Sequence, residues 1–181
     1  MKGKATSIGV ILIAAGSIFL GREMLIPTFE TLKVGANSGD LGQNLHVYPN
    51  RVLPIMGNVY INTSAAVWTV NQATDQVVLK QGGYFNVSGH IDLVDVVDSI
   101  QSNCAVEAWI TKNSVQVSPY YRSNYFTRVN ALNKAEISIS SNIFVWSQFD
   151  TIRLMVRPVS GDTLCRVRIN TTYSYLQFHK Y

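Results

Sequence analysis

Charged residues are scarce in this 181-residue chain, at 14%, whereas hydrophobic residues make up 47%. An average globular domain carries about 25% charged residues. The shortage predicts a surface that is covered by neighbouring chains or by uncharged polar side chains. The length suffices for one domain with a full core and a short appendage.

Lysine and arginine form no run anywhere, although the net charge is +4. Half of that charge sits at the N-terminus, where Lys2, Lys4 and Arg22 outweigh Glu23. Proteins that hold nucleic acid by charge gather basic residues on one face or stretch. The sequence therefore argues against specific nucleic-acid binding.

The motifs that mark enzymes and metal sites are missing as well. His46, His90 and His179 are isolated, and no H-x-H pair occurs of the kind that a cupin metal site uses. The chain has no G-x-S-x-G, no Walker-type loop and no G-x-G-x-x-G. We predict a protein that is not an enzyme, without catalytic residues, metal or cofactor.

Two small groups of residues are weaker candidates. Asp92, Asp95 and Asp98 lie close together at a predicted strand end and offer oxygens to Ca²⁺, but a solvated strand end is favoured. Cys104 and Cys165 are far apart in sequence. Two buried thiols are favoured over a disulfide, because nothing else marks a disulfide scaffold.

Four arginines fall on two successive predicted strands and would form a patch if those strands paired as a hairpin. Acidic residues are available to neutralise it, so a neutralised surface is favoured over an anion-binding site. The arginines are Arg153, Arg157, Arg166 and Arg168, and the acids are Glu107, Glu136 and Asp150.

The first 27 residues predict an N-terminal hydrophobic helix. Ala5 to Gly21 is a run of 17 residues without charge, which as a helix spans about 26 Å of the roughly 30 Å hydrocarbon layer. Lys2 and Lys4 favour an interior N-terminus. A membrane anchor is favoured over a hydrophobic arm buried in a protein assembly, and over a cleaved signal peptide. The anchor residues are Ile8, Val10, Ile11, Leu12, Ile13, Ile18, Phe19 and Leu20.

Residues 28–44 are rich in Gly, Ser and Asn and predict a linker, with Thr28 to Lys33 able to extend the helix by a turn or two. From Leu45 the pattern is β throughout. Residues 84–93 and 152–157 alternate apolar with polar side chains, and turn residues such as Lys112-Asn-Ser114 separate the runs. We expect a β-sandwich or jelly roll of about eight to ten antiparallel strands in residues 45–181.

Three stretches of this region resemble the jelly rolls of the tumour necrosis factor and complement globular-head families. They are Gly82–Ile91, which is similar to a G-x-Y-x-F/V-x-G strand, Val106–Asn113, and Ile143–Leu154, where Phe149-Asp150 stands in place of Gly-Asp. The similarity spans about Trp68 to Phe178. Related jelly rolls also occur in viral spikes, pentons and minor capsid proteins.

The resemblance implies a homo-oligomer, a trimer or a pentamer. Aromatic residues dominate interface energetics, and the candidate interface residues are Tyr120, Tyr121, Tyr125, Phe126, Tyr173 and Tyr175. Our leading hypothesis is a virion structural protein, a minor capsid, penton or spike subunit that contacts other capsid proteins and is tethered to a membrane by its N-terminus. The alternative is a membrane-anchored receptor- or glycan-binding ligand of the tumour necrosis factor type with an extracellular domain.

Overall fold

The computed structural model describes residues 30–36, 45, 51–52, 58–95, 105–123, 134–146, 148–159 and 167–181. These residues form strands and no helix. The strands are β1 (Glu30–Gly35), β2 (Arg51–Val52), β3 (Asn58–Asn62), β4 (Trp68–Asn71), β5 (Gln76–Leu79), β6 (Gly83–Asp95), β7 (Val106–Lys112), β8 (Val115–Gln116), β9 (Tyr121–Arg122), β10 (Lys134–Val145), β11 (Asp150–Pro158), β12 (Val167–Ile169) and β13 (Tyr175–Lys180).

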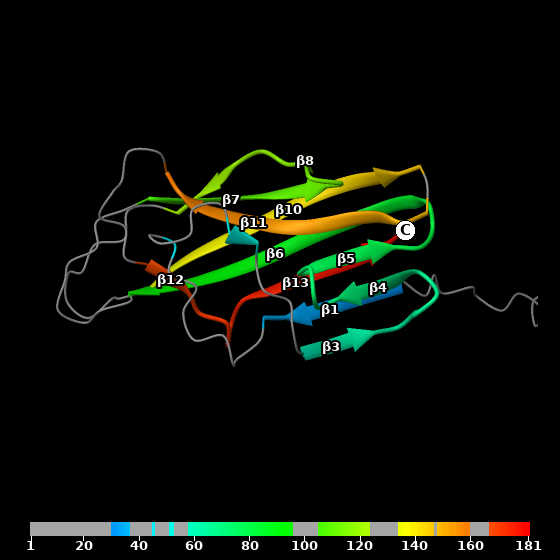
Figure 1. Ribbon diagram of the computed structural model, residues 1–181, viewed down its shortest axis with the longest axis horizontal. Coiled ribbons are helices and arrows are strands. Elements are labelled where there is room, and N and C mark those ends of the chain that lie inside the picture. Colours follow the sequence, from blue (N-terminus) through cyan, green and yellow to red (C-terminus); the bar gives the residue numbers. More distant parts are fainter. Residues whose placement is uncertain are drawn as a thin grey trace, which may run out of the picture.

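The strands form two antiparallel sheets, which Figure 1 shows as two layers whose strands lie in roughly the same direction. Sheet A has the order β10-β6-β13-β1-β3, with β12 also paired to β6. Sheet B has the order β4-β5-β11-β7-β8, with β2 on β11 and β9 on β7. Each sheet thus joins strands from distant parts of the sequence, as jelly rolls do.

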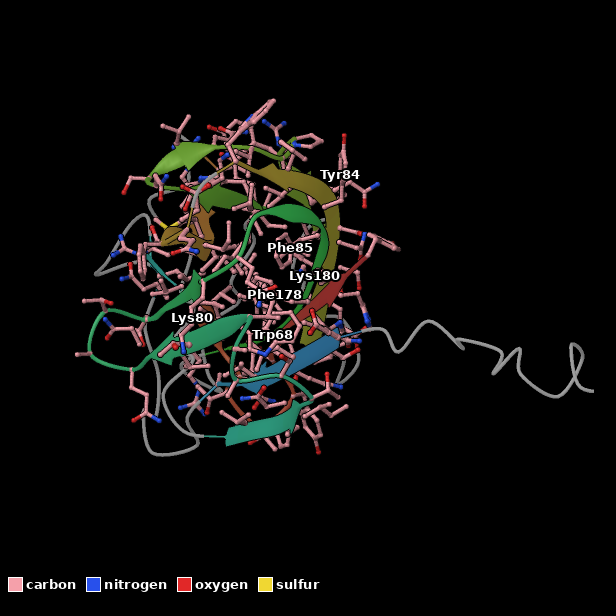
Figure 2. The ribbon with its side chains drawn as sticks, turned by 90° about the vertical axis from the view of Figure 1, so that its right-hand side faces the viewer. Trp68, Lys80, Tyr84, Phe85, Phe178 and Lys180 are labelled. Atoms are coloured by element: carbon pink, nitrogen blue, oxygen red, sulfur yellow. The ribbon has the colours of Figure 1, made fainter. Side chains whose placement is uncertain are left out.

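The core lies between the sheets and is built by the alternation that the sequence shows. Phe85, Val87 and Ile91 of β6 point inward and are fully buried, and Ile152 and Leu154 of β11 meet them from sheet B. Three aromatic rings fill the core beside β1, where the Trp68 ring lies 6.5 Å from the rings of both Phe85 and Phe178. Figure 2 shows these three rings together between the layers.

The predicted all-β sandwich is therefore confirmed in its architecture. The described residues form 13 strands instead of eight to ten. The difference comes from short pieces, because β2, β8 and β9 have two residues each. The turn at Lys112-Asn-Ser114 is where the sequence places it, and Asn113 and Ser114 both have positive φ, as a two-residue hairpin of the I′ type requires.

Residues 30–35, which the sequence analysis assigns to a linker or a helical extension, instead form β1. This strand lies inside sheet A, paired with β13 on one side and β3 on the other. Leu32 and Val34 are fully buried in the core. The ladder partners are up to 150 residues away in sequence, with Glu30 opposite Lys180, so local composition gives no sign of them.

The predicted helix, and with it the anchor residues Ile8 to Leu20, lies outside the described residues. Within the part that the structure describes, no helix has the length and apolarity needed to cross a membrane. The N-terminal anchor thus stays a prediction from sequence.

Candidate interaction surfaces

The outer face of sheet A carries few charged groups. Alternation places one side chain in two of β6, β10, β13 and β1 on this face, and the charged residues at these positions are Lys33, Lys134 and Glu136 besides the buried Asp92. Arg168 of β12, opposite Val94, shares the face. The remaining members are serine, threonine, asparagine, glutamine, histidine and aromatic side chains: Thr31, Tyr84, Asn86, Ser88, His90, Ser138, Ser140, Asn142, Phe144, Tyr175, Gln177 and His179.

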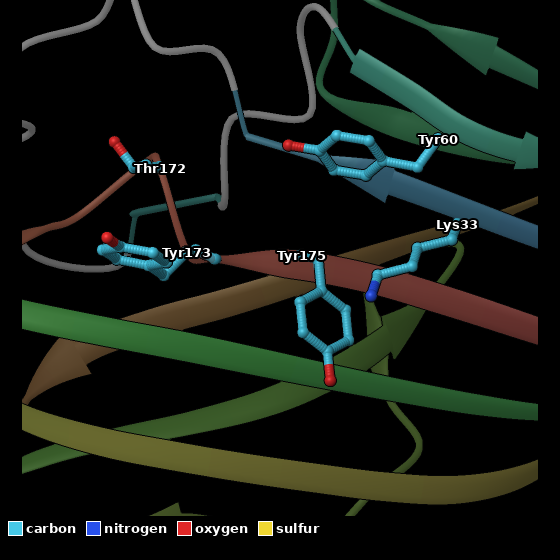
Figure 3. A pocket seen from close by; sticks show the side chains of 6 residues that line it. Lys33, Tyr60, Thr172, Tyr173 and Tyr175 are labelled. Carbon is cyan, nitrogen blue, oxygen red and sulfur yellow. The ribbon is translucent and has the colours of Figure 1, made fainter.

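Tyr175 lies at the centre of a stack on this face. Its ring is 5.5 Å from the imidazole of His90, nearly parallel to it, and 3.9 Å from Nζ of Lys33, on the neighbouring strand β1. Beside the stack is a hollow of ≈ 310 Å³, shown in Figure 3. Tyr60, Thr172, Tyr173 and Ser174 complete its lining. Three phenol rings and one ammonium group suit a sugar or an acidic side chain.

A second aromatic group lies at the opposite end of the same sheet, where β1 begins and β13 ends. Tyr84 and Phe144 are cross-strand neighbours with ring centroids 4.6 Å apart, and Trp146 packs edge-on against Phe144 at 4.6 Å. Tyr84, Phe85, Asn142 and Tyr181 line an open hollow of ≈ 370 Å³ there. Figure 2 looks onto this end and shows Tyr84 projecting from it.

The outer face of sheet B carries the most buried ion-pair group. Glu107 is 2% exposed and accepts hydrogen bonds from Nε of Arg122 at 3.1 Å and Nε of Arg157 at 2.7 Å. The Arg157 guanidinium also lies over the rings of Trp109, at 4.9 Å, and Tyr120, at 5.2 Å. The hydrogen bond to Glu107 raises the pKa of Arg157. The buried carboxylate of Glu107 is therefore matched by two arginines, Arg122 and Arg157.

The predicted interface tyrosines do not form one surface. Tyr173 and Tyr175 lie together at the Figure 3 hollow on sheet A. Tyr120 belongs to the sheet B cluster. Tyr121 packs against the core and donates a hydrogen bond from its hydroxyl to the carbonyl of Ser140 at 2.8 Å, so it joins β9 to β10 within the subunit. Tyr125 and Phe126 lie outside the described residues.

The hypothetical four-arginine patch does not form. Arg153 and Arg157 are in sheet B, whereas Arg168 is on β12 of sheet A, and Arg166 is outside the described residues. The predicted patch required β11 to pair with the next strand, β12, as a hairpin. Instead, β12 belongs to the other sheet. Arg153 donates to Gln76 instead of to an acid.

The remaining candidates have ordinary structural roles or lie outside the described residues. Asp92 accepts a hydrogen bond from Asn170 at 2.7 Å, and His179 contacts Thr31 and Gln177. No group of three metal-ligating side chains occurs in the part that the structure describes. Side-chain descriptions do not extend to His46, Asp95, Asp98, Cys104 or Cys165.

The sequence analysis missed the aromatic group at the end of sheet A. Its members come from three separate places in the chain, at Tyr84, at Phe144 to Trp146 and at Tyr181. The one available signal was that Tyr84 occupies a polar-face position of the predicted strand at residues 84–93, where an aromatic ring is exposed. That pattern identifies exposure but does not show which rings meet.

No protein-family model and no curated protein matches this sequence. Solved structures do match it. Crystal structures of murine APRIL, a tumour necrosis factor family protein, at pH 5.0 and pH 8.5 each align with a TM-score of 0.56 at 9% identity, over 84% of this chain and 99% of theirs. A third murine APRIL structure, at pH 8.0, gives 0.54 at 10% identity.

At this identity the likeness concerns the fold, and it confirms the tumour necrosis factor-like jelly roll that the sequence resembles. Nothing in the comparisons supports a capsid, penton or spike subunit. The absence of catalytic, metal and cofactor chemistry stays a prediction.

Proposed function

We propose that this chain is a non-enzymatic, self-assembling binding protein of the tumour necrosis factor type. Its N-terminal segment tethers it to a membrane, and its jelly roll assembles with sister subunits and recognises a receptor or glycan outside the cell. The observation that carries the proposal is the charge-poor outer face of sheet A.

That face has the composition of a protein interface. Interface centres are depleted of charge and enriched in aromatic residues, and here Tyr84, Phe144 and Tyr175 stand among serines, asparagines and a glutamine. A solvated sheet face in a free protein would carry more lysine and glutamate. Burying about 800 Å² per subunit is usual for a stable complex, and the face offers the strands of a whole sheet.

The Figure 3 hollow is our candidate for part of the binding surface. It lies where β1 ends and β13 begins, away from Glu30, so a subunit tethered through its N-terminus would hold it away from the tether. Lys33 and the tyrosine rings at positions 60, 173 and 175 offer one cation, hydroxyl donors and flat apolar faces. These suit an acidic or sugar-bearing partner.

Assembly is tested with an arginine placed at the centre of the face. Ser88 lies between Ser140 of β10 and Gln177 of β13. In a symmetric assembly Ser88→Arg brings several positive charges together, so full-length protein in mild detergent should change from oligomer to single subunit in light scattering. Thr69→Arg is the control, because Thr69 is exposed on β4 of sheet B. A wild-type chain that is already single would refute assembly.

Recognition is tested with the assembled full chain in lipid nanodiscs, applied to cell surfaces and to a glycan array. Binding that Tyr173→Ala reduces at unchanged melting temperature supports the proposal. Failure to bind any surface, together with recovery of the chain in purified particles at a multiple of three or five per vertex, would favour the virion hypothesis instead.

A further inference from the structure

Exposed apolar side chains gather at one end of the sandwich. We call this the entry end, because β1 begins there at Glu30, and we define its surface by Tyr84, Val115, Trp146, Phe149 and Tyr181. Of the ten large hydrophobic side chains that are exposed among the described residues, these five lie at this end. Figure 1 shows it as the end where β6, β10 and β13 meet the C-terminus.

The surface is assembled from both sheets. Tyr84 is the second residue of β6 and Trp146 follows β10 in sheet A, whereas Phe149 precedes β11 in sheet B. Tyr181 donates its backbone N–H to the carbonyl of Tyr84 at 3.1 Å, which fixes the C-terminal residue beside β6. Trp146 is 85% exposed and Phe149 is 68% exposed. An exposed apolar patch of this kind marks a surface that a membrane or another protein covers.

One aromatic ring is kept there at a conformational cost. Phe149 has a φ of +74° in the left-handed region, which disfavours a residue with a bulky side chain. Its N–H donates to the carbonyl of Leu79, so the turn is fixed. Glycine would relieve the strain at this position. An exposed phenylalanine that gains no core contact is most readily explained by a role outside the fold.

We propose that the entry end rests on the surface of a phospholipid bilayer. The 29 residues that precede Glu30 contain the 17-residue uncharged run Ala5 to Gly21. A segment of this kind in the bilayer would hold the entry end near the headgroups. Tryptophan and tyrosine concentrate at that depth, since their rings are apolar and their N–H or O–H groups reach water.

Charge contributes little to this contact. Lys180 is 3.5 Å from Glu30, and Lys112 is 3.6 Å from Asp150, so two lysines at this end are already paired. Lys80 donates to the carbonyl of Ala65. Attraction by the aromatic rings should therefore be nearly independent of salt and should not require anionic lipid, unlike adsorption by a polybasic patch.

This inference rests on the membrane tether of the proposed function, and it is tested by a different measurement. The chain has three tryptophans, of which Trp68 is 1% and Trp109 7% exposed, so Trp146 is a built-in reporter. Full-length protein is reconstituted in phosphatidylcholine vesicles with or without bromine on the upper part of the acyl chains. Brominated lipid should remove up to about one third of the emission, and Trp146→Phe should abolish that loss.

A matched control moves the reporter to the other end. Tyr173 is 59% exposed and lies beyond the start of β13. Tyr175 is opposite His90 and Val145 is opposite Gly83, so the two reporter positions are more than about 20 Å apart along the strand direction. In the Trp146→Phe background, Tyr173→Trp should not be quenched by brominated lipid. Equal quenching at both ends would overturn the proposal, because it would show nonspecific contact.

The proposal would also be overturned if brominated lipid failed to quench Trp146 of the wild-type protein in these vesicles. If acrylamide in water then fails to quench Trp146 in the assembled protein, the aromatic rings are covered by sister subunits instead. Oligomer formation tested with Ser88→Arg does not depend on this result, so either proposal can fail while the other stands.

Discussion

Arg157 places its Nη2 atom 2.6 Å from Oε1 of Glu107, a carboxylate that is almost completely buried on the outer face of sheet B. The second partner, Arg122, lies 3.1 Å from the other oxygen, and its side chain is 62% exposed against 35% for Arg157. The two arginines therefore share one acid but differ in how much the fold depends on them.

Replacing Arg157 with methionine should cost about 2 kcal/mol of unfolding free energy, because it leaves a buried carboxylate with one solvated partner. Arg122→Met should cost less than about 1 kcal/mol, as for an exposed ion pair. Urea denaturation followed by circular dichroism measures both. Equal costs would show that the less exposed arginine contributes no more to stability than the exposed one.

The same pair allows a prediction about pH. The hydrogen bond to Glu107 raises the pKa of Arg157 above its ordinary value. A group whose pKa is raised on folding contributes fully below its unfolded pKa and loses that contribution only as pH rises through the folded one. For an arginine both are strongly alkaline, so the stability difference between wild type and Arg157→Met should be equal at about pH 6 and about pH 9. Urea denaturation of both proteins at the two pH values would detect any change in this stability difference.

Phe149→Gly should stabilise the fold by about 1 kcal/mol, because glycine adopts a positive φ without the steric cost that phenylalanine has there. The side chain is 68% exposed, so little packing is lost. Phe149→Ala keeps a Cβ atom and should give no such gain. Thermal unfolding distinguishes the two variants, and an equal effect would mean that removal of the ring, and not backbone strain, is responsible.

Replacing two glycines with alanine should cost different amounts of stability. A Cβ on Gly89 would lie 2.7 Å from a methyl carbon of Leu154 and 3.0 Å from one of Ile139, between packed sheets. Gly89→Ala should therefore destabilise the protein by about 1–3 kcal/mol. A Cβ on Gly35 would meet the ring of Tyr60, which is 54% exposed and can swing away.

We expect Gly35→Ala to cost less than about 1 kcal/mol. Melting temperatures of the two variants, measured side by side, test the difference. A Gly35 variant as unstable as the Gly89 variant would show that the Tyr60 ring is fixed in place.

Tyr121→Phe should lower stability by about 1 kcal/mol, because the hydroxyl that donates to Ser140 is removed while the ring remains. Tyr60→Phe, on the exposed edge strand β3, should change it by less than about 0.5 kcal/mol. Chemical denaturation gives both values. If Tyr121→Phe instead leaves stability unchanged and weakens the oligomer in light scattering, Tyr121 is an interface residue, as the sequence analysis predicted.

Much of the fold could be predicted from sequence because the apolar stripes have the strand period. Phe85, Val87 and Ile91 identify β6 and its buried face without any knowledge of its partners, and Asn113-Ser114 identifies the turn after β7. The substitution of Phe149 for glycine is visible in sequence as a departure from the family pattern. Its positive φ appears only in the structure.

The candidate surfaces were less predictable, since they depend on which strands become neighbours. Tyr120 and Tyr121 are adjacent in sequence, yet one stacks near Arg157 on sheet B and the other is bonded to β10 of sheet A. Conversely, Tyr84, Trp146 and Tyr181 share one end although they are distributed over about half of the chain.

The sequence by itself determined the all-β class, the inward-facing residues of the long strands and the shortage of charge, since each follows from residue type and a period of two. Tertiary structure alone decided that Glu30–Gly35 is a strand in the middle of sheet A, that Arg168 is separated from Arg153, and that five exposed hydrophobic side chains share the entry end. The physical reason is that antiparallel pairing brings together residues from distant parts of the chain, and the sequence of one strand does not identify the strand with which it pairs.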